Sequence, residues 1–244
     1  MSPAAEPELR KPRLGVLAFG DSITNAGGEL QWGVALHSWA LWTARGLGLP
    51  YTGFAVDGAR VGDLVTEQLA AFAARSADPN ARYDVGCLYI GVNDVQAPDW
   101  DPVGFEAGFG TALAFLSARC ERTLALTLAT GLGVPPATAA ARAANAVIGR
   151  QASAHGALVV SLDSFGARNQ VMPDRVHPTA FGQIAIAERA LAVLAADGLP
   201  TRVAPASLLD YEVTWLGRLR HDLTYLYRSA KAQARAGLER VGNR

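Results

Sequence analysis

Short apolar runs alternate with longer amphipathic stretches along most of the chain. Five apolar runs have the length and content of buried strands, and each is followed by turn residues. These runs are 14–19, 51–56, 85–90, 123–129 and 157–162. Stretches with helical spacing follow them, at about 32–47, 61–75, 105–119, 137–155 and 179–196. Strands that alternate with helices pair in parallel through right-handed crossovers. The pattern therefore predicts an α/β fold, a three-layer α/β/α sandwich whose five-stranded parallel sheet has the flavodoxin-like strand order 2-1-3-4-5.

Polar turns follow the carboxyl ends of four of these strands. Open α/β sheets present ligand-binding and catalytic side chains at this edge. Ser22 follows the first strand, Gly58 the second and Asn93 the third, and the loop after the fifth strand carries Asp174 and His177. In the predicted strand order, these four turns open on the same edge of the sheet and can converge.

The residues on these turns match the needs of acyl transfer. A serine hydroxyl requires a base that removes its proton, and the base requires a third group that orients it. Asp174 and His177 are three residues apart, so the carboxylate can accept from one imidazole nitrogen while the other faces Ser22. The N–H groups of Ser22 and Gly58 and the amide of Asn93 could stabilise an oxyanion. Taken singly, each residue is equally well explained as a turn or helix-cap residue.

Four short blocks, in order along residues 14–194, resemble the SGNH hydrolases, also called the GDSL-like lipase and acylhydrolase family. The blocks are Gly20-Asp21-Ser22, Ala55-Val56-Asp57-Gly58, Gly91-Val92-Asn93-Asp94 and Asp174-Arg175-Val176-His177-Pro178. The resemblance implies that Ser22 is the nucleophile, His177 the base and Asp174 its orienting partner. It also implies an oxyanion hole formed by Ser22, Gly58 and Asn93. In one departure, the second block often carries an Asn five residues before its glycine, where this chain has Gly53.

The resemblance implies a serine esterase that cleaves a carboxylic ester through an acyl-enzyme, and we expect a short acyl chain or an acetylated sugar. An acyltransferase that uses the same acyl-enzyme with a sugar or alcohol acceptor stays open, because pocket shape decides whether water is excluded. The alternative from another class is a flavodoxin-like domain that binds a phosphate or nucleotide. Against it, no Lys or Arg follows Ser22 in its loop and no Gly-x-Gly-x-x-Gly pattern opens the first helix.

Several further residues are close to the predicted site in sequence and could line a substrate pocket. The apolar ones among them could equally belong to the core. These candidates are Asp21, Trp32, Val92, Asp94, Met172 and Val176, together with Trp100.

The resemblance implies a small-molecule ester as the partner, and composition indicates no nucleic acid beside it. The 22 basic and 22 acidic residues balance to a net charge of zero, so a polyanion such as nucleic acid is not indicated. The two cysteines, Cys87 and Cys120, and the four histidines have no ligand-like spacing, and we expect no metal and no cofactor. Neither an apolar leader nor a membrane-spanning run is present, which predicts a cytoplasmic protein.

The sequence predicts three parts: a disordered lead at 1–12, the hydrolase domain at 13–200, and a C-terminal amphipathic helical extension at 201–244. In the extension, Leu216, Leu219, Leu223 and Leu226 recur at intervals of three and four. We expect this helix to pack on the domain or on a second subunit of a homo-oligomer. Attachment to an anionic lipid surface is the alternative, because basic amphipathic helices can lie in the membrane interface.

Overall fold

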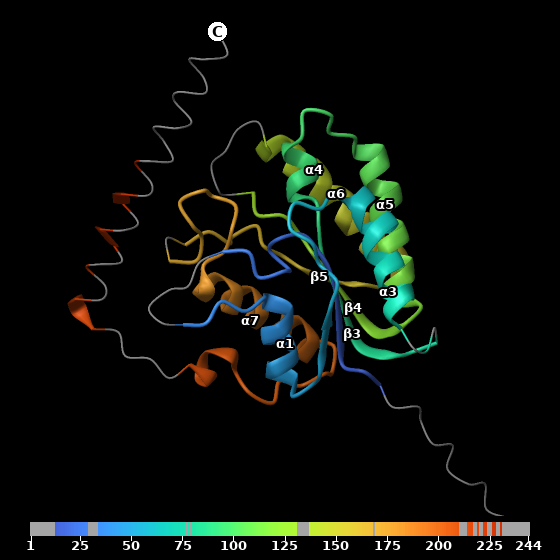
Figure 1. Cartoon of the computed structure of the whole chain (residues 1–244), viewed down its shortest axis with the longest axis horizontal. Coiled ribbons are helices and arrows are strands. Elements are labelled where there is room, and N and C mark those ends of the chain that lie inside the picture. The colour runs from blue at the N-terminus through green and yellow to red at the C-terminus, as the bar shows by residue number, and fades with distance from the viewer. Residues whose placement is uncertain are drawn as a thin grey trace, which may run out of the picture.

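A single parallel sheet organises the chain (Figure 1). The computed structural model describes residues 13–28, 34–76, 78, 80–130, 137–167 and 169–209, followed by single residues and short groups between 214 and 230. Within these residues the sheet has five strands in the order β2-β1-β3-β4-β5, and each neighbouring pair is parallel. The strands are β1 Val16–Gly20, β2 Tyr51–Gly53, β3 Tyr83–Tyr89, β4 Cys120–Leu126 and β5 Leu158–Val160. The predicted fold class and strand order are confirmed.

Helices cover both faces of this sheet. On one face lie α1 (Trp39–Leu47) and α7 (Ala180–Ala196), which contact each other (Figure 1). On the other face lie α2 (Val61–Asp63), a π-helical turn (Leu64–Gln68), α3 (Leu69–Arg75), α4 (Val92–Gln96), α5 (Pro102–Ser117) and α6 (Ala137–His155). A 3-10 turn, Pro205–Leu208, follows α7. These helices form the outer layers of the sandwich.

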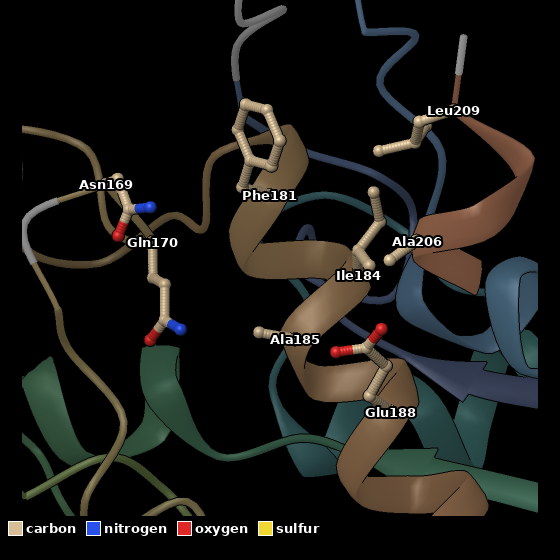
Figure 2. A pocket seen from close by; sticks show the side chains of 8 residues that line it. All are labelled: Asn169, Gln170, Phe181, Ile184, Ala185, Glu188, Ala206 and Leu209. Atoms are coloured by element: carbon tan, nitrogen blue, oxygen red, sulfur yellow. The ribbon is translucent and has the colours of Figure 1, made fainter. Parts of the chain in front are cut away.

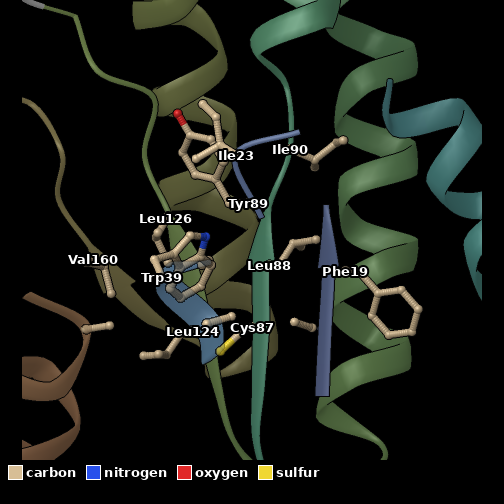
Figure 3. Packing of buried hydrophobic residues seen from close by; sticks show 14 of the residues in the cluster. Phe19, Ile23, Trp39, Cys87, Leu88, Tyr89, Ile90, Leu124, Leu126 and Val160 are labelled. Carbon is tan, nitrogen blue, oxygen red and sulfur yellow. The ribbon is translucent and has the colours of Figure 1, made fainter. Parts of the chain in front are cut away.

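Strand β1 lies at the centre of the core and is buried along its whole length. Phe19 on β1 packs in a cluster of aromatic rings with Phe54, Phe72 and Phe115, with its ring centroid 5.5 to 6.2 Å from theirs. Figure 3 shows Phe19 on one side of the sheet and Trp39 on the other, both fully buried. Both faces of β1 are packed, so the turn that follows Gly20 begins from a strand whose position is fixed.

The first helix begins later than the apolar pattern predicts. The pattern predicts a start at about residue 32, whereas α1 begins at Trp39. Ser38 is its N-cap, and the Ser38 Oγ accepts a hydrogen bond from the backbone N–H of Leu41 at 3.1 Å. Residues 35–38 have no helical structure, and Trp32 lies outside the described residues. Because the whole stretch is rich in Ala and Leu, its composition does not show where α1 begins.

The domain continues past its predicted boundary at residue 200. The backbone N–H groups of Arg202 and Val203 donate to the carbonyl of Gly46 at the end of α1, at 2.8 and 3.1 Å. Pro205 is buried, and Leu209 packs against the core. Residues 201–209 therefore belong to the packed unit, whereas the predicted lead at 1–12 lies outside the described residues. Among the described residues, no helix is both long and apolar enough to cross a membrane.

Candidate active site

Ser22, His177 and Asp174 form one chain of hydrogen bonds. The Ser22 Oγ lies 2.9 Å from His177 Nε2, although the two residues are 155 positions apart in sequence. The other imidazole nitrogen, Nδ1, lies 2.8 Å from Asp174 Oδ2. Both distances are those of good hydrogen bonds. The structure thus brings together the three residues that the sequence places on two separate turns.

The carboxylate of Asp174 holds the loop that carries His177. Asp174 Oδ1 accepts hydrogen bonds from the backbone N–H groups of Val176 and His177, at 2.9 and 3.0 Å. Arg175, between Asp174 and Val176, adopts a positive φ of 61°, which turns the backbone sharply around the carboxylate. Asp174 therefore uses one oxygen to shape the loop and the other to orient the imidazole ring.

A buried glutamine holds the backbone just before the candidate nucleophile. Gln68, which is 1 % exposed, lies on the π-helical turn. Its Oε1 accepts from the N–H of Gly20 at 3.1 Å, and its Nε2 donates to the carbonyl of Gly20 at 2.8 Å. Gly20 itself leaves no room for a side chain, because a Cβ there would lie 2.2 Å from the carbonyl oxygen of Tyr89. The peptide groups that lead into Ser22 are thus fixed on both sides.

A second buried glutamine joins the Ser22 turn to α7, which begins next to the His177 loop. Gln183 on α7 donates from Nε2 to the carbonyl of Ile23 at 2.9 Å. Its Oε1 accepts from the N–H of Trp39 at 2.8 Å, and Trp39 Nε1 donates to Thr24 Oγ1 at 3.2 Å. Because α7 also begins at the cap Thr179, one helix positions both partners of the Ser22–His177 hydrogen bond.

Two glycines let the loop after Ser22 lie against the His177 loop. A Cβ on Gly27 would lie 2.8 Å from the carbonyl oxygen of Ser22 and 3.2 Å from His177 Cδ2. A Cβ on Gly28, whose φ is +145°, would lie 2.3 Å from the carbonyl oxygen of Pro178. Larger side chains at these positions would therefore push the two loops apart.

The predicted oxyanion donors lie on turns that hydrogen bonds connect. Asn25, after Ser22, donates from Nδ2 to Asp57 Oδ1 at 2.9 Å, which joins the first turn to the turn of Gly58. Gly58 is exposed and has a φ of +76°, and no described atom lies within 4 Å of the position that a Cβ would take. Backbone conformation, rather than lack of space, therefore favours glycine at this turn.

Asn93 connects to the same turn from the next strand end. It is half-buried, and its Nδ2 donates to the carbonyl of Ala59 at 3.0 Å. The Asn93 amide has a second hydrogen that this contact does not use. No hydrogen bond among the described residues joins Gly58 and Asn93 to one common point, so their role in an oxyanion hole stays a prediction.

The candidate pocket residues differ in their surroundings. Asp21 is fully buried, and both oxygens of Asp94, which is 8 % exposed, accept from the N–H of Val61 at 3.1 and 3.2 Å. Their burial gives no support to a place for these two carboxyls in the substrate pocket. Val92, Met172 and Val176 are partly buried, so a place in the substrate pocket stays a prediction for them. Trp100, like Val92, packs against the core.

A pocket of about 350 Å³ lies beside the base of the His177 loop, between α7 and the chain that follows it (Figure 2). It is lined by Asn169, Gln170, Phe181, Ile184, Ala185, Glu188, Ala206 and Leu209. None of the predicted site residues lines it, so it is a different hollow from the predicted substrate pocket. Within the described residues, no group of three or more His, Cys, Asp or Glu is arranged to hold a metal ion.

The family model described as the GDSL-like lipase/acylhydrolase family matches residues 18–184, more than half of the chain. The chain belongs to this family. It is accordingly an SGNH-type ester hydrolase, and this result disfavours the phosphate-binding alternative. The departure from the family pattern at Gly53 has a local counterpart, because the Tyr51 hydroxyl oxygen lies 2.5 Å from the position of a Cβ on Gly53. The Tyr51 ring thus occupies the space that a side chain at Gly53 would need.

Solved structures with the same fold include three whose matches with this GDSL-like hydrolase cover 74 % of its chain. The first is LAE5, an alpha/beta hydrolase enzyme from the metagenome of Lake Arreo, Spain, with 23 % identity, 94 % of its chain covered and a TM-score of 0.59. The second is Axe2, an acetylxylan esterase from Geobacillus stearothermophilus, with 18 % identity, 93 % covered and 0.56. The third is a member of the lipolytic protein G-D-S-L family from Veillonella parvula, with 20 % identity, 98 % covered and 0.59. A comparison with curated proteins gave no match.

Charges in the site of this hydrolase favour an ionised Asp174 paired with His177. The hydrogen bond that His177 Nδ1 donates to Asp174 is the main cause that raises the pKa of His177 above its usual 6.5, and burial opposes it. For Asp174, burial acts to raise the pKa, but the hydrogen bonds from His177 and Val176 together outweigh it and lower the pKa below 3.8. An ionised Asp174 keeps a proton on Nδ1, so the lone pair of Nε2 faces Ser22.

Asp21 adds a second titratable carboxyl next to the nucleophile. Burial raises the pKa of Asp21 from 3.8 to about 7, which the hydrogen bond from the N–H of Ile23 partly offsets. Its Oδ2 has no hydrogen-bond partner among the described residues. The charge of a protonated His177 acts to lower the pKa of Asp21, and an ionised Asp21 adds a minor contribution to the raised pKa of His177.

Replacing Gln68 with Ala should impair both stability and turnover. The change removes the side-chain acceptor of the buried Gly20 N–H and one of two donors to the Gly20 carbonyl, which also accepts from the N–H of Val56 at 3.1 Å. We therefore expect a loss of about 2 kcal/mol of unfolding free energy. We also expect kcat for p-nitrophenyl acetate to fall about tenfold with little change in KM. Urea unfolding and steady-state kinetics measure both, with the half-buried Gln151→Ala on α6 as the matched control. Wild-type kcat in the Gln68→Ala variant would show that this contact does not position Ser22.

The pH profile should show a limb set by His177. Only neutral imidazole accepts the serine proton, so kcat/KM should fall as the pH drops through an apparent pKa above 6.5. Asp174→Asn removes the main cause of the raised pKa, so the limb should move to lower pH while the rate falls about 10⁴-fold. The surface variant Asp163→Asn on the loop after β5 is the control. An unchanged limb in Asp174→Asn would contradict this assignment.

Proposed function

We propose that this protein is a serine esterase that hydrolyses a carboxylic ester through an acyl-enzyme on Ser22. The observation that carries the proposal is the hydrogen-bond chain from Ser22 Oγ through His177 to Asp174, at 2.9 and 2.8 Å. A nucleophile, a base within reach of its proton and a carboxylate that orients the base are the parts of a catalytic triad. Family membership assigns ester hydrolysis, and this chain of contacts supports the route.

In the first half of the reaction, the Ser22 Oγ attacks the ester carbonyl and His177 Nε2 takes the serine proton. The ionised Asp174 stabilises the imidazolium that forms. The backbone N–H groups of Ser22 and Gly58 and the second amide hydrogen of Asn93 donate to the oxyanion. The ester C–O bond then breaks, His177 gives its proton to the departing alcohol, and the acyl group stays on Ser22.

In the second half, water replaces the alcohol. His177 takes a proton from the water as its oxygen attacks the acyl-enzyme, and then returns a proton to Ser22 Oγ as the carboxylic acid leaves. Access of water favours hydrolysis over transfer to another alcohol. The side chains of His177 and Asp174 are 31 and 41 % exposed, so in this structure solvent reaches the catalytic pair.

We propose a short acyl chain, such as the acetyl group of an acetylated sugar, as the substrate class. The surface next to Gly58 is polar, because Arg60 and Asp99 form an exposed ion pair with 3.0 Å between Nη1 and Oδ1. A polar surface suits a hydroxylated leaving group better than a long alkyl chain. That the similar fold of Axe2 belongs to an acetylxylan esterase agrees with this choice.

Ser22→Ala should abolish ester hydrolysis without loss of the fold. We expect kcat for p-nitrophenyl acetate to fall at least about 10³-fold, because no other group supplies the acyl-enzyme. Circular dichroism checks the fold, and the exposed Ser153→Ala on α6 is the matched control. Retained turnover in Ser22→Ala would overturn the proposed mechanism.

The wild-type enzyme should also prefer short acyl chains. We expect higher kcat/KM for p-nitrophenyl acetate than for the decanoate, and release of acetate from acetylated xylo-oligosaccharides. Faster turnover of the decanoate would exclude the short-chain assignment, and preferential formation of a new ester with added alcohol would favour the acyltransferase.

A further inference from the structure

The chain beyond the domain presents a row of exposed apolar side chains. Large apolar residues occur at 215, 216, 219, 223, 226 and 227, intervals of one, three and four that are typical of one side of a helix. The structure describes helical backbone at each of these six positions. The large apolar members are Trp215, Leu216, Leu219, Leu223, Leu226 and Tyr227, and they are 47 to 76 % exposed. We call these six residues the apolar row. Packing on the domain, which the sequence favours, does not cover them in this structure.

This row has no counterpart within the described part of the catalytic domain. Singly exposed apolar side chains are normal on protein surfaces, but a contiguous row of them marks an interaction site. On the domain, the exposed Val103 on α5 and Val159 on β5 belong to different elements. Two members of the row, Trp215 and Tyr227, are aromatic residues of the kind that favours the boundary between apolar and aqueous phases.

Charge is divided unevenly between the domain and this segment. Residues 214–244 contain seven basic and two acidic residues, a net charge of +5, whereas residues 1–213 contain fifteen basic and twenty acidic residues, a net charge of −5. The overall balance of zero therefore hides a strongly basic tail. In the sequence, Arg220 follows Leu216 and Lys231 follows Tyr227 by four positions, the spacing of neighbouring side chains in a helical pattern.

We propose that the segment 214–235 docks this enzyme on an anionic lipid surface, with the apolar row in the interface and the basic side chains on the lipid headgroups. A basic amphipathic helix with aromatic and leucine residues on one side is the pattern that lies in the plane of a membrane interface. Long basic side chains at the border of the row can reach the headgroups while their stems stay among apolar groups.

A second copy of the chain is the weaker occupant for the same row. Pairing two rows would bring together two copies of residues 214–244, which each have a net charge of +5, and like charges oppose such pairing. An anionic surface neutralises this charge. Each basic side chain near such a surface contributes about 1 kcal/mol of binding, which salt weakens.

Vesicle co-sedimentation of the full chain tests the proposal. We expect binding to vesicles of phosphatidylcholine with 40 % phosphatidylglycerol, weaker binding in 0.5 M NaCl, and little binding to pure phosphatidylcholine. Leu219→Glu with Leu226→Glu should abolish binding, and Arg220→Gln with Lys231→Gln should weaken it at least about tenfold. Matched controls on the domain are Val103→Glu for the apolar change and Arg142→Gln with Arg150→Gln for the basic change. All variants should hydrolyse p-nitrophenyl acetate at the wild-type rate.

Three results would overturn the proposal. The first is no binding to the anionic vesicles, and the second is equal binding to neutral vesicles. The third is a dimer in analytical ultracentrifugation that the Leu219→Glu and Leu226→Glu changes disrupt while vesicle binding persists, which would assign the row to a second copy. Because the soluble ester assay is scored separately, loss of docking is distinguishable from failure of the catalytic assignment.

Discussion

The hydrogen bond between Ser22 Oγ and His177 Nε2 is the interaction on which the rest of this site depends, because it requires two distant segments to be held in fixed positions. It joins the first strand end to a loop 155 residues later, and its 2.9 Å distance tolerates little movement of either side. Buried side-chain amides hold these two segments in place. Gln68 fixes the backbone before Ser22, and Gln183 joins the turn after it to α7. The partly buried Ser22 is thus held in place by side chains that solvent does not reach.

The same constraint explains the glycines around the site. Gly20, Gly27 and Gly28 each stand where a Cβ would lie within 3 Å of a backbone carbonyl oxygen. Gly28 lies against the backbone of the His177 loop at Pro178, Gly27 lies against the carbonyl of Ser22 and the His177 ring, and Gly20 lies against Tyr89 on β3. This close approach brings the base to the nucleophile, and it excludes larger residues at positions that take no part in the chemistry.

Sequence patterns were sufficient for the sheet and for the catalytic chain of contacts. Continuous apolar runs mark strands that are covered on both faces, and parallel strands place their carboxyl ends at one edge, which brings Ser22 and His177 together. The two glutamines could not be recognised, because a buried glutamine in a helical stretch has the same local pattern as an exposed one. Their partners are 48 and 160 positions away, and only the fold reveals such contacts.

Boundaries were harder to predict than elements, and the reason is local. The Ala-, Leu- and Trp-rich stretch before Leu47 has helical composition, yet the Ser38 cap decides where α1 begins. At the other end of the chain, helical spacing predicts an apolar row, but spacing alone does not say what covers it. Exposure of that row, together with the separation of charge between domain and tail, is the observation that points to a lipid surface.

The central claim is that His177 and Asp174 make Ser22 a nucleophile. Labelling with a fluorophosphonate tests it without knowledge of the natural ester, because such a probe reacts covalently with activated serines. Intact-mass analysis should show one adduct per chain, peptide mapping should place it on Ser22, and His177→Ala should label far more slowly. An adduct on another residue, or no adduct under conditions where the protein hydrolyses p-nitrophenyl acetate, would contradict the account.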